Sequence, residues 1–179
     1  MSLSIAVLAR LALCAVFLVS AGSKLATAPA RTAFAEAVTV FGAMPARWSR
    51  AAAGVVVLAE VAVAVGLCVN QLSRPALYGA AALLLVFAIA LWAGLRRGVM
   101  MPCACFGASQ SPARPPEIWR NLLLAALALI GAIGDGAPAA LLGGPAAAVV
   151  DRLLIAAFVT VLAAGFSDFT DILNLRRAA

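Results

Sequence analysis

Two cysteines separated by a single residue, Cys103 and Cys105, carry the most reactive side chains of this 179-residue sequence. In an extended backbone, residues two apart point to the same side and lie roughly 6.6 Å apart, close to the largest Cα separation that a disulfide bridges. The bond therefore forms only if the backbone bends, and the strain makes it easy to reduce. The spacing predicts a catalytic pair that cycles between dithiol and disulfide, as in a thiol-disulfide oxidoreductase.

The residues around this pair favour a fixed, sharply turned loop. Pro102 precedes the pair and Gly107 follows it. Arg96 and Arg97 lie a few residues upstream, where their charge favours a thiolate. We therefore place a redox loop at residues 96–117.

The same segment allows a second interpretation. Four soft sulfur ligands fall within it, and thiolate with thioether selects Cu(I) over hard cations. These ligands are Met100, Met101, Cys103 and Cys105. Alternatively, the two methionines bind no metal and are packing residues at the end of an apolar span. The sequence has no histidine, which excludes histidine-ligated metals and histidine-activated nucleophiles in this chain.

Glu60 is the other informative residue, because it is the sole charge in a long apolar stretch. It lies about nine residues into a predicted span, roughly 13 Å below the membrane surface, where its charge must be paired or neutralised. Lys24 is the first candidate partner and Arg10 the second. The carboxylate either handles protons or contacts a cofactor, or it forms an ion pair that specifies packing.

The remaining cysteines, Cys14 and Cys68, stand in apolar stretches where small packing residues are common. We interpret both as inert packing thiols. Cys68 is expected near the membrane face opposite the redox loop, so direct exchange between them is not expected.

The apolar content dictates the elements that hold these groups. Of all residues, 65% are hydrophobic and 11% charged, which is more apolar surface than a soluble domain of this length can bury. We predict an all-α, polytopic transmembrane bundle of four to five spans, a single membrane domain over residues 1–179 in contact with membrane lipid. The spans are expected at residues 3–23, 51–70, 75–95, 118–134 and 146–166.

Two connections between spans have predicted structure. Phe34, Val38 and Phe41 recur at helical spacing, which favours an interfacial amphipathic helix between the first two spans. The polar run at residues 70–74 is short, so the second and third spans should form an antiparallel hairpin.

Several of these features together resemble the MauE family of methylamine-utilisation membrane proteins, within the DoxX-like group. The resemblance covers roughly Leu8 to Asn121, and Ala104 departs from the glycine that the family more often has there. It rests on Arg10, Gly22-Ser23-Lys24-Leu25, Phe41-Gly42 with Pro45, Glu60 and Cys103-Ala104-Cys105-Phe106-Gly107.

The resemblance implies a multi-pass protein that acts in redox or disulfide maturation of a partner. In the founding case this partner is the light subunit of methylamine dehydrogenase. It also implies that Pro102, Phe106 and Gly107 support the two loop cysteines. A thioredoxin-like protein or the client would exchange with them, and a membrane quinone would pass electrons.

The charge distribution sets the expected topology in a plasma (inner) membrane. The net charge is +6, and the basic residues lie in the connections between spans. This placement is typical of topological anchors and not of nucleic-acid binding. With five spans, the side that bears the redox loop carries Lys24, Arg31, Arg47, Arg50, Arg96, Arg97, Arg114, Arg120, Arg176 and Arg177. The other side carries Arg10, Arg74 and Arg152. The positive-inside rule then places the loop in the cytoplasm, whereas oxidative maturation of a secreted client requires an oxidising compartment.

Three functional hypotheses stand. The first is thiol-redox maturation by Cys103 and Cys105, the second is Cu(I) binding or transfer, and the third is a membrane subunit without catalysis. The side of the membrane on which the loop lies, and whether the chain is an enzyme, stay open.

Overall fold

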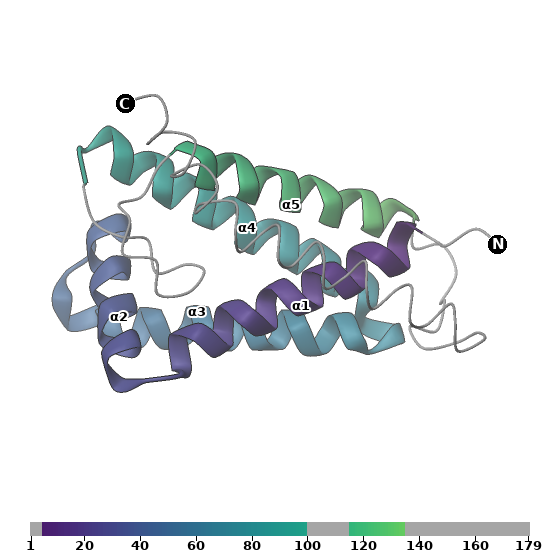
Figure 1. Cartoon of the computed structure of the whole chain (residues 1–179), viewed down its shortest axis with the longest axis horizontal. Coiled ribbons are helices and arrows are strands. Elements are labelled where there is room, and N and C mark those ends of the chain that lie inside the picture. Colours follow the sequence, from purple (N-terminus) through teal and green to yellow (C-terminus); the bar gives the residue numbers. More distant parts are fainter. Residues whose placement is uncertain (1–4, 100–114, 135–179) are drawn as a thin grey trace, which may run out of the picture.

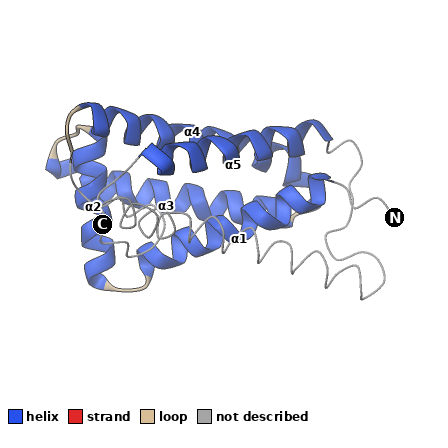
Figure 2. Ribbon diagram, turned by 45° about the horizontal axis from the view of Figure 1, so that its top comes forward, coloured by secondary structure: helices blue, strands red, loops and turns tan. Residues whose placement is uncertain are grey.

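The fold was examined in a computed structural model that describes residues 5–99 and 115–134, and these residues form helices joined by short loops (Figures 1 and 2). The elements are α1 (Ile5–Leu25), α2 (Ala28–Gly42), α3 (Ala46–Cys68), the 3₁₀ turn η1 (Asn70–Leu72), α4 (Ser73–Arg96) and α5 (Pro115–Gly134). The predicted all-α class is confirmed. The predicted fifth span at 146–166 lies outside the described residues.

Four described helices are long and apolar enough to cross a membrane. Their apolar segments are Ala6–Leu25, Ala46–Cys68, Asn70–Arg96 and Pro115–Ile133. The burial pattern is the reverse of that in a soluble protein. Arg10 and Glu60 are fully buried, whereas Leu58 and Ile133 are 70% and 77% exposed. The structure is therefore a helical membrane bundle. The second span starts at Ala46, five residues before the predicted boundary, because the polar first turns of α3 continue the helix beyond the apolar stretch.

The long helices run antiparallel in sequence order (Figure 1). The α2 end of the bundle holds the C-terminus of α1, the N-terminus of α3, the C-terminus of α4 and the N-terminus of α5. The opposite hairpin end holds residues 68–73 and the N-terminal turns of α1. The α3–α4 hairpin is confirmed, with η1 as its turn.

Helix α2 lies across one end of the bundle, as an interfacial helix would. It begins at Thr27, whose hydroxyl accepts a hydrogen bond from the Ala30 N–H at 3.2 Å. Phe34 and Phe41 are buried, whereas Glu36 on the other face is exposed. This apolar face packs against the ends of the long helices, so α2 has the predicted amphipathic character.

Small residues let the long helices approach closely. A Cβ added at Gly66 of α3 would lie 2.9 Å from the Cβ of Ala76 in α4, and one at Gly131 of α5 would lie 2.9 Å from the Cβ of Ala9 in α1. A Cβ at Gly94 would overlap the ring of Phe41. These contacts fix the distances between the long helices and the position of α2 against α4.

Two glycines of α3 provide a test of this close packing. We expect Gly66→Ala to lower the free energy of unfolding by about 1–3 kcal/mol, because the new methyl group has no room beside Ala76. Gly54→Ala is the matched control, since nothing lies within 4 Å of a Cβ at Gly54 and alanine favours helix. Thermal unfolding of both variants in detergent measures the difference, and equal stability of the two would contradict the packing argument.

Candidate functional site

The predicted redox loop lies largely outside the described residues. Cys103 and Cys105 fall in the segment 100–114, as do the candidate metal ligands and turn residues Met100, Met101, Pro102, Phe106 and Gly107. The described residues that flank this segment are Val99, after α4, and Pro115, which begins α5. Both flanks lie at the α2 end (Figure 1).

The two arginines upstream of this segment have partners in the bundle. The Arg97 Nη2 donates a hydrogen bond of 2.6 Å to the Phe41 carbonyl oxygen, and its Nε donates one of 3.1 Å to the Ala93 carbonyl oxygen. The Arg96 guanidinium lies 4.4 Å from the centre of the Trp92 ring, a cation–π geometry. Arg97 therefore ties the end of α4 to the end of α2.

Glu60 of α3 forms a buried ion pair with Lys24 of α1, as the sequence predicted. The Lys24 Nζ contacts the Glu60 Oε1, and both side chains are at most 1% exposed. Ser20, one turn before Lys24, donates a hydrogen bond of 3.0 Å to the same carboxylate oxygen and accepts one of 3.0 Å from Lys24. Three polar side chains thus bind one another inside the bundle, where there is no water to hydrogen-bond them.

The surroundings of this pair connect two further helices, α2 and α4. The Lys24 Nζ lies 4.5 Å from the centre of the Phe34 ring of α2 and 5.2 Å from that of Phe87 in α4. The second carboxylate oxygen of Glu60, Oε2, has no hydrogen-bond partner among the described residues. A carboxylate normally accepts hydrogen bonds at both oxygens. Oε2 therefore remains able to take up a proton or to accept a hydrogen bond.

Arg10, the second candidate partner of Glu60, lies instead at the hairpin end. Its guanidinium donates to the Leu67 carbonyl oxygen from Nε at 3.1 Å and from Nη2 at 3.0 Å, and also to the Asn70 Oδ1 at 3.0 Å. The last carbonyl groups of a helix lack intrahelical partners, and a cation there is favourable. Arg10 therefore closes the C-terminus of α3 and fixes it against α1.

The structure also brings Cys14 and Cys68 together, a pairing that our sequence interpretation missed. Their sulfur atoms lie 3.1 Å apart, and the Cys14 Sγ lies 3.5 Å from the Ala64 carbonyl oxygen. The available signal was Arg10, one turn before Cys14: a cation that must reach the polar hairpin turn places Cys14 beside the end of α3. Two thiols interpreted as separate packing residues are thus neighbours.

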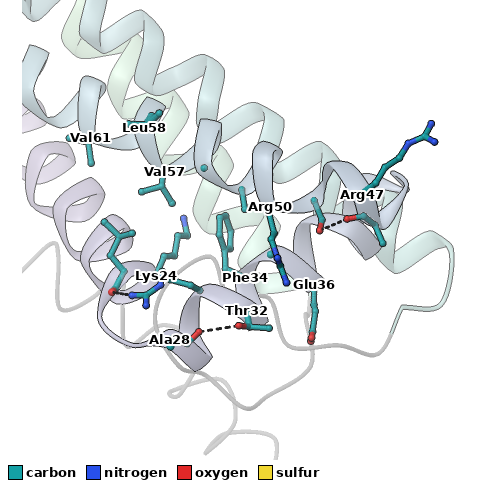
Figure 3. A pocket seen from close by; sticks show the side chains of 17 residues that line it. Lys24, Ala28, Thr32, Phe34, Glu36, Arg47, Arg50, Val57, Leu58 and Val61 are labelled. Atoms are coloured by element: carbon teal, nitrogen blue, oxygen red, sulfur yellow. Dashed lines mark hydrogen bonds between the residues drawn. The ribbon is translucent and has the colours of Figure 1, made fainter.

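A cavity of about 970 Å³ opens between the end of α1, α2 and α3 (Figure 3). Phe34, Val57 and Val61 give it an apolar wall, and Lys24 contributes to its lining. Exposed arginines stand around it, namely Arg31, Arg47 and Arg50. Apolar walls with basic groups at the margin suit an amphiphile whose head is anionic or carries carbonyl oxygens.

The contribution of the Lys24–Glu60 pair to stability can be tested by substitution. We expect Glu60→Gln to destabilise the chain by about 3–5 kcal/mol, because it leaves the Lys24 ammonium buried without an opposite charge. The double variant Lys24→Met/Glu60→Met should recover most of the loss, since no charge is then buried. Thermal unfolding in detergent measures both, with Glu36→Gln on the exposed face of α2 as control. A single variant as stable as that control would show that the pair does not hold the bundle.

Comparison with known proteins gives the family. Residues 2–134 match the family model described as methylamine utilisation protein MauE, a range that includes both loop cysteines and all five described α-helices. A curated relative, the methylamine utilization protein MauE of Paracoccus denitrificans, is 46% identical over 112 residues. The match covers 60% of this chain and 58% of the relative, less than two thirds of its length. No solved structure matches. On the extent of the family match, the chain belongs to the MauE family of methylamine utilisation proteins.

Proposed function

We propose that this chain is a membrane-embedded thiol-redox factor of methylamine utilisation, which matures a partner protein through Cys103 and Cys105. The observation that carries the proposal is the Cys-x-Cys pair inside the range that matches the MauE family. A relative whose name assigns it to methylamine utilisation adds the metabolic setting. A methylamine dehydrogenase-type subunit is then the client.

The chemistry is thiol–disulfide exchange. A thiolate of the pair attacks a disulfide sulfur of the client or of a thioredoxin-like partner, and the neighbouring cysteine resolves the mixed disulfide. The chain ends as the Cys103–Cys105 disulfide, and the partner disulfide ends as two thiols. The reverse sequence delivers a disulfide to the partner. After the reverse sequence, a membrane quinone, which takes up two electrons and two protons, would reoxidise the loop dithiol. After the forward sequence, the dithiol of a reduced thioredoxin-like partner would supply two electrons and two protons to the loop disulfide.

The cavity beside Lys24 supports a binding site for such a quinone. Its volume of about 970 Å³ is at the upper end of the range for small-molecule pockets. It lies at the α2 end, where α4 ends and α5 begins on either side of the loop segment. Lys24 lines the cavity and pairs with Glu60, so a proton-handling group stands next to the space that a quinone head would occupy.

The exposed charges support an orientation. Arg10 and Lys24 are buried and bound to other side chains, so they do not act as free topological anchors. Among the described residues, the exposed arginines at the α2 end are Arg31, Arg47, Arg50, Arg96 and Arg97, and the hairpin end has Arg74. The positive-inside rule then favours the cytoplasmic side of an inner membrane for the α2 end. A cytoplasmic loop favours reduction or thiol relay.

Complementation tests the proposal. In Paracoccus denitrificans that lacks its own relative, we expect the chain to restore growth on methylamine, and Cys103→Ser or Cys105→Ser each to abolish it, because either change removes one half of the disulfide. Ser109→Ala in the same segment is the control. Full growth with both cysteine variants, at equal membrane abundance, would refute a redox role of the loop.

Metal analysis separates the Cu(I) alternative. The reduced, purified chain should contain no stoichiometric copper if the loop acts by thiol exchange. Stoichiometric copper that is lost on Met100→Leu/Met101→Leu would favour a soft-metal site instead.

A further inference from the structure

We propose that Cys14 and Cys68 form a second redox site, a reversible dithiol/disulfide at the hairpin end that exchanges with a disulfide-bearing protein on that face of the membrane. This site goes beyond the proposed function, because it uses neither cysteine of the loop between α4 and α5.

The distance between the two thiols carries the inference. Their sulfur atoms are 3.1 Å apart, although the residues are 54 positions apart in sequence and belong to different helices. A disulfide joins its sulfurs at about 2.0 Å, so closing this pair requires a shift of about 1 Å, within the reach of small side-chain rotations. Two cysteines that are distant in the sequence are thus within reach of a disulfide.

The surrounding contacts hold the pair in place. Arg10, one helical turn before Cys14 on α1, binds the carbonyl of Leu67, which directly precedes Cys68. The same guanidinium binds Asn70, two residues after Cys68. The helix end that carries Cys68 is thus fixed to the helix that carries Cys14, so the pair is preorganised. Arg10 is a positioning residue in this site.

The two thiols differ in access, as exchange requires. Cys14 is 9% exposed and packs in the core, whereas Cys68 is exposed at the last residue of α3. The turn that follows contains Asn70 and the exposed Gln71 and Arg74, groups that mark the boundary with water. Cys68 is therefore the thiol that a partner reaches, and Cys14 is the resolving thiol behind it.

The exchange balances in two steps. The Cys68 thiolate attacks one sulfur of the partner disulfide, which forms a mixed disulfide and releases the other partner sulfur as a thiolate. Cys14, after losing its proton, attacks the Cys68 Sγ, which forms the Cys14–Cys68 bond and expels the remaining partner sulfur. The two protons from Cys14 and Cys68 pass through water to the partner thiolates. The pair has lost two electrons, and the partner disulfide has gained them.

The charge distribution supports an oxidising location for this pair. The exposed arginines gather at the α2 end, and the hairpin end carries Arg74 alone among the exposed arginines of the described residues. The positive-inside rule then directs the hairpin end away from the cytoplasm. Disulfides persist in that compartment, and partner proteins with accessible disulfides are found there.

Thiol counting tests the site on the full chain. The sequence has four cysteines, so Cys103→Ser/Cys105→Ser leaves only Cys14 and Cys68. We expect two maleimide–polyethylene glycol adducts per denatured chain after reduction and none after equilibration with glutathione disulfide, with the chain remaining monomeric on a non-reducing gel. Two adducts after the oxidant, or a bond only between chains, would overturn the proposal. Because the loop cysteines are absent, this result does not depend on the proposed function.

Two variants in the same background resolve the roles of the thiols. Cys14→Ala should trap glutathione on Cys68, because the resolving thiol is missing, whereas Cys68→Ser should leave the buried Cys14 free of glutathione. Cys14→Ala/Ala15→Cys is the matched control, since a cysteine one position along α1 points about 100° away from α3. A disulfide in that control as complete as with Cys14 would show that the observed geometry is not the cause.

Labelling in intact cells tests the side. We expect a membrane-impermeant maleimide to modify Cys68 from outside in the reduced Cys103→Ser/Cys105→Ser chain. Modification only after the cells are broken would place the pair in the cytoplasm and overturn its assignment to the oxidising face.

Discussion

The ion pair between Lys24 and Glu60 is the contact on which the arrangement of the bundle depends. A carboxylate with no exposed surface, in a helix that crosses a membrane, needs an opposite charge within reach, and Lys24 supplies it from α1. The same ammonium lies against Phe34 of α2 and Phe87 of α4. One buried cation therefore joins four helices, and it sets where α2 crosses the end of the bundle. The cavity between α1, α2 and α3 follows from that placement.

Arg10 does at the hairpin end what Lys24 does at the α2 end. Both lie on α1, and each reaches across to α3, Lys24 to Glu60 and Arg10 to the carbonyl of Leu67. Two polar contacts at separate points along the same antiparallel pair fix the register of one helix against the other, because a slip of either helix would break both. On the same interface, Cys14 lies between Arg10 and Lys24 on α1, and Cys68 directly follows Leu67 on α3. The meeting of Cys14 and Cys68 is thus a consequence of the register.

The sequence predicted much of the fold because the physical signals are local. Long apolar stretches locate the spans, the spacing of Phe34 and Phe41 identifies α2, and the short polar run at 70–74 identifies the hairpin. The partner of Glu60 was also predictable, because few cations lie in apolar surroundings. The start of α3 was predicted five residues too late, because polar residues in its first turns carry no hydropathy signal although they are helical.

The cysteine pair could not be predicted from hydropathy or from depth along each span. Counted from the ends of the predicted spans, Cys14 lies near the middle of the membrane and Cys68 near one face. The structure brings them to the same level because Arg10 binds Leu67 in the last turn of α3 and Asn70 just after it, which places the N-terminal part of α1 at the hairpin end. Information about register resides in such polar contacts between helices, and a pattern read along one helix does not contain it.

The distribution of exposed arginines gives the two thiol pairs different meanings. The positive-inside rule favours the cytoplasm for the arginine-rich α2 end of the described residues, and thiols are kept reduced in that compartment. By the same rule, our proposal assigns the Cys14–Cys68 pair to the oxidising side. The conflict expected from the sequence, between the positive-inside rule and oxidative maturation of a client, concerned only the loop cysteines. If the Cys14–Cys68 pair acts as we propose, reduction in the cytoplasm and exchange outside it do not both have to be carried by the loop cysteines, and the positive-inside rule is compatible with a maturation role.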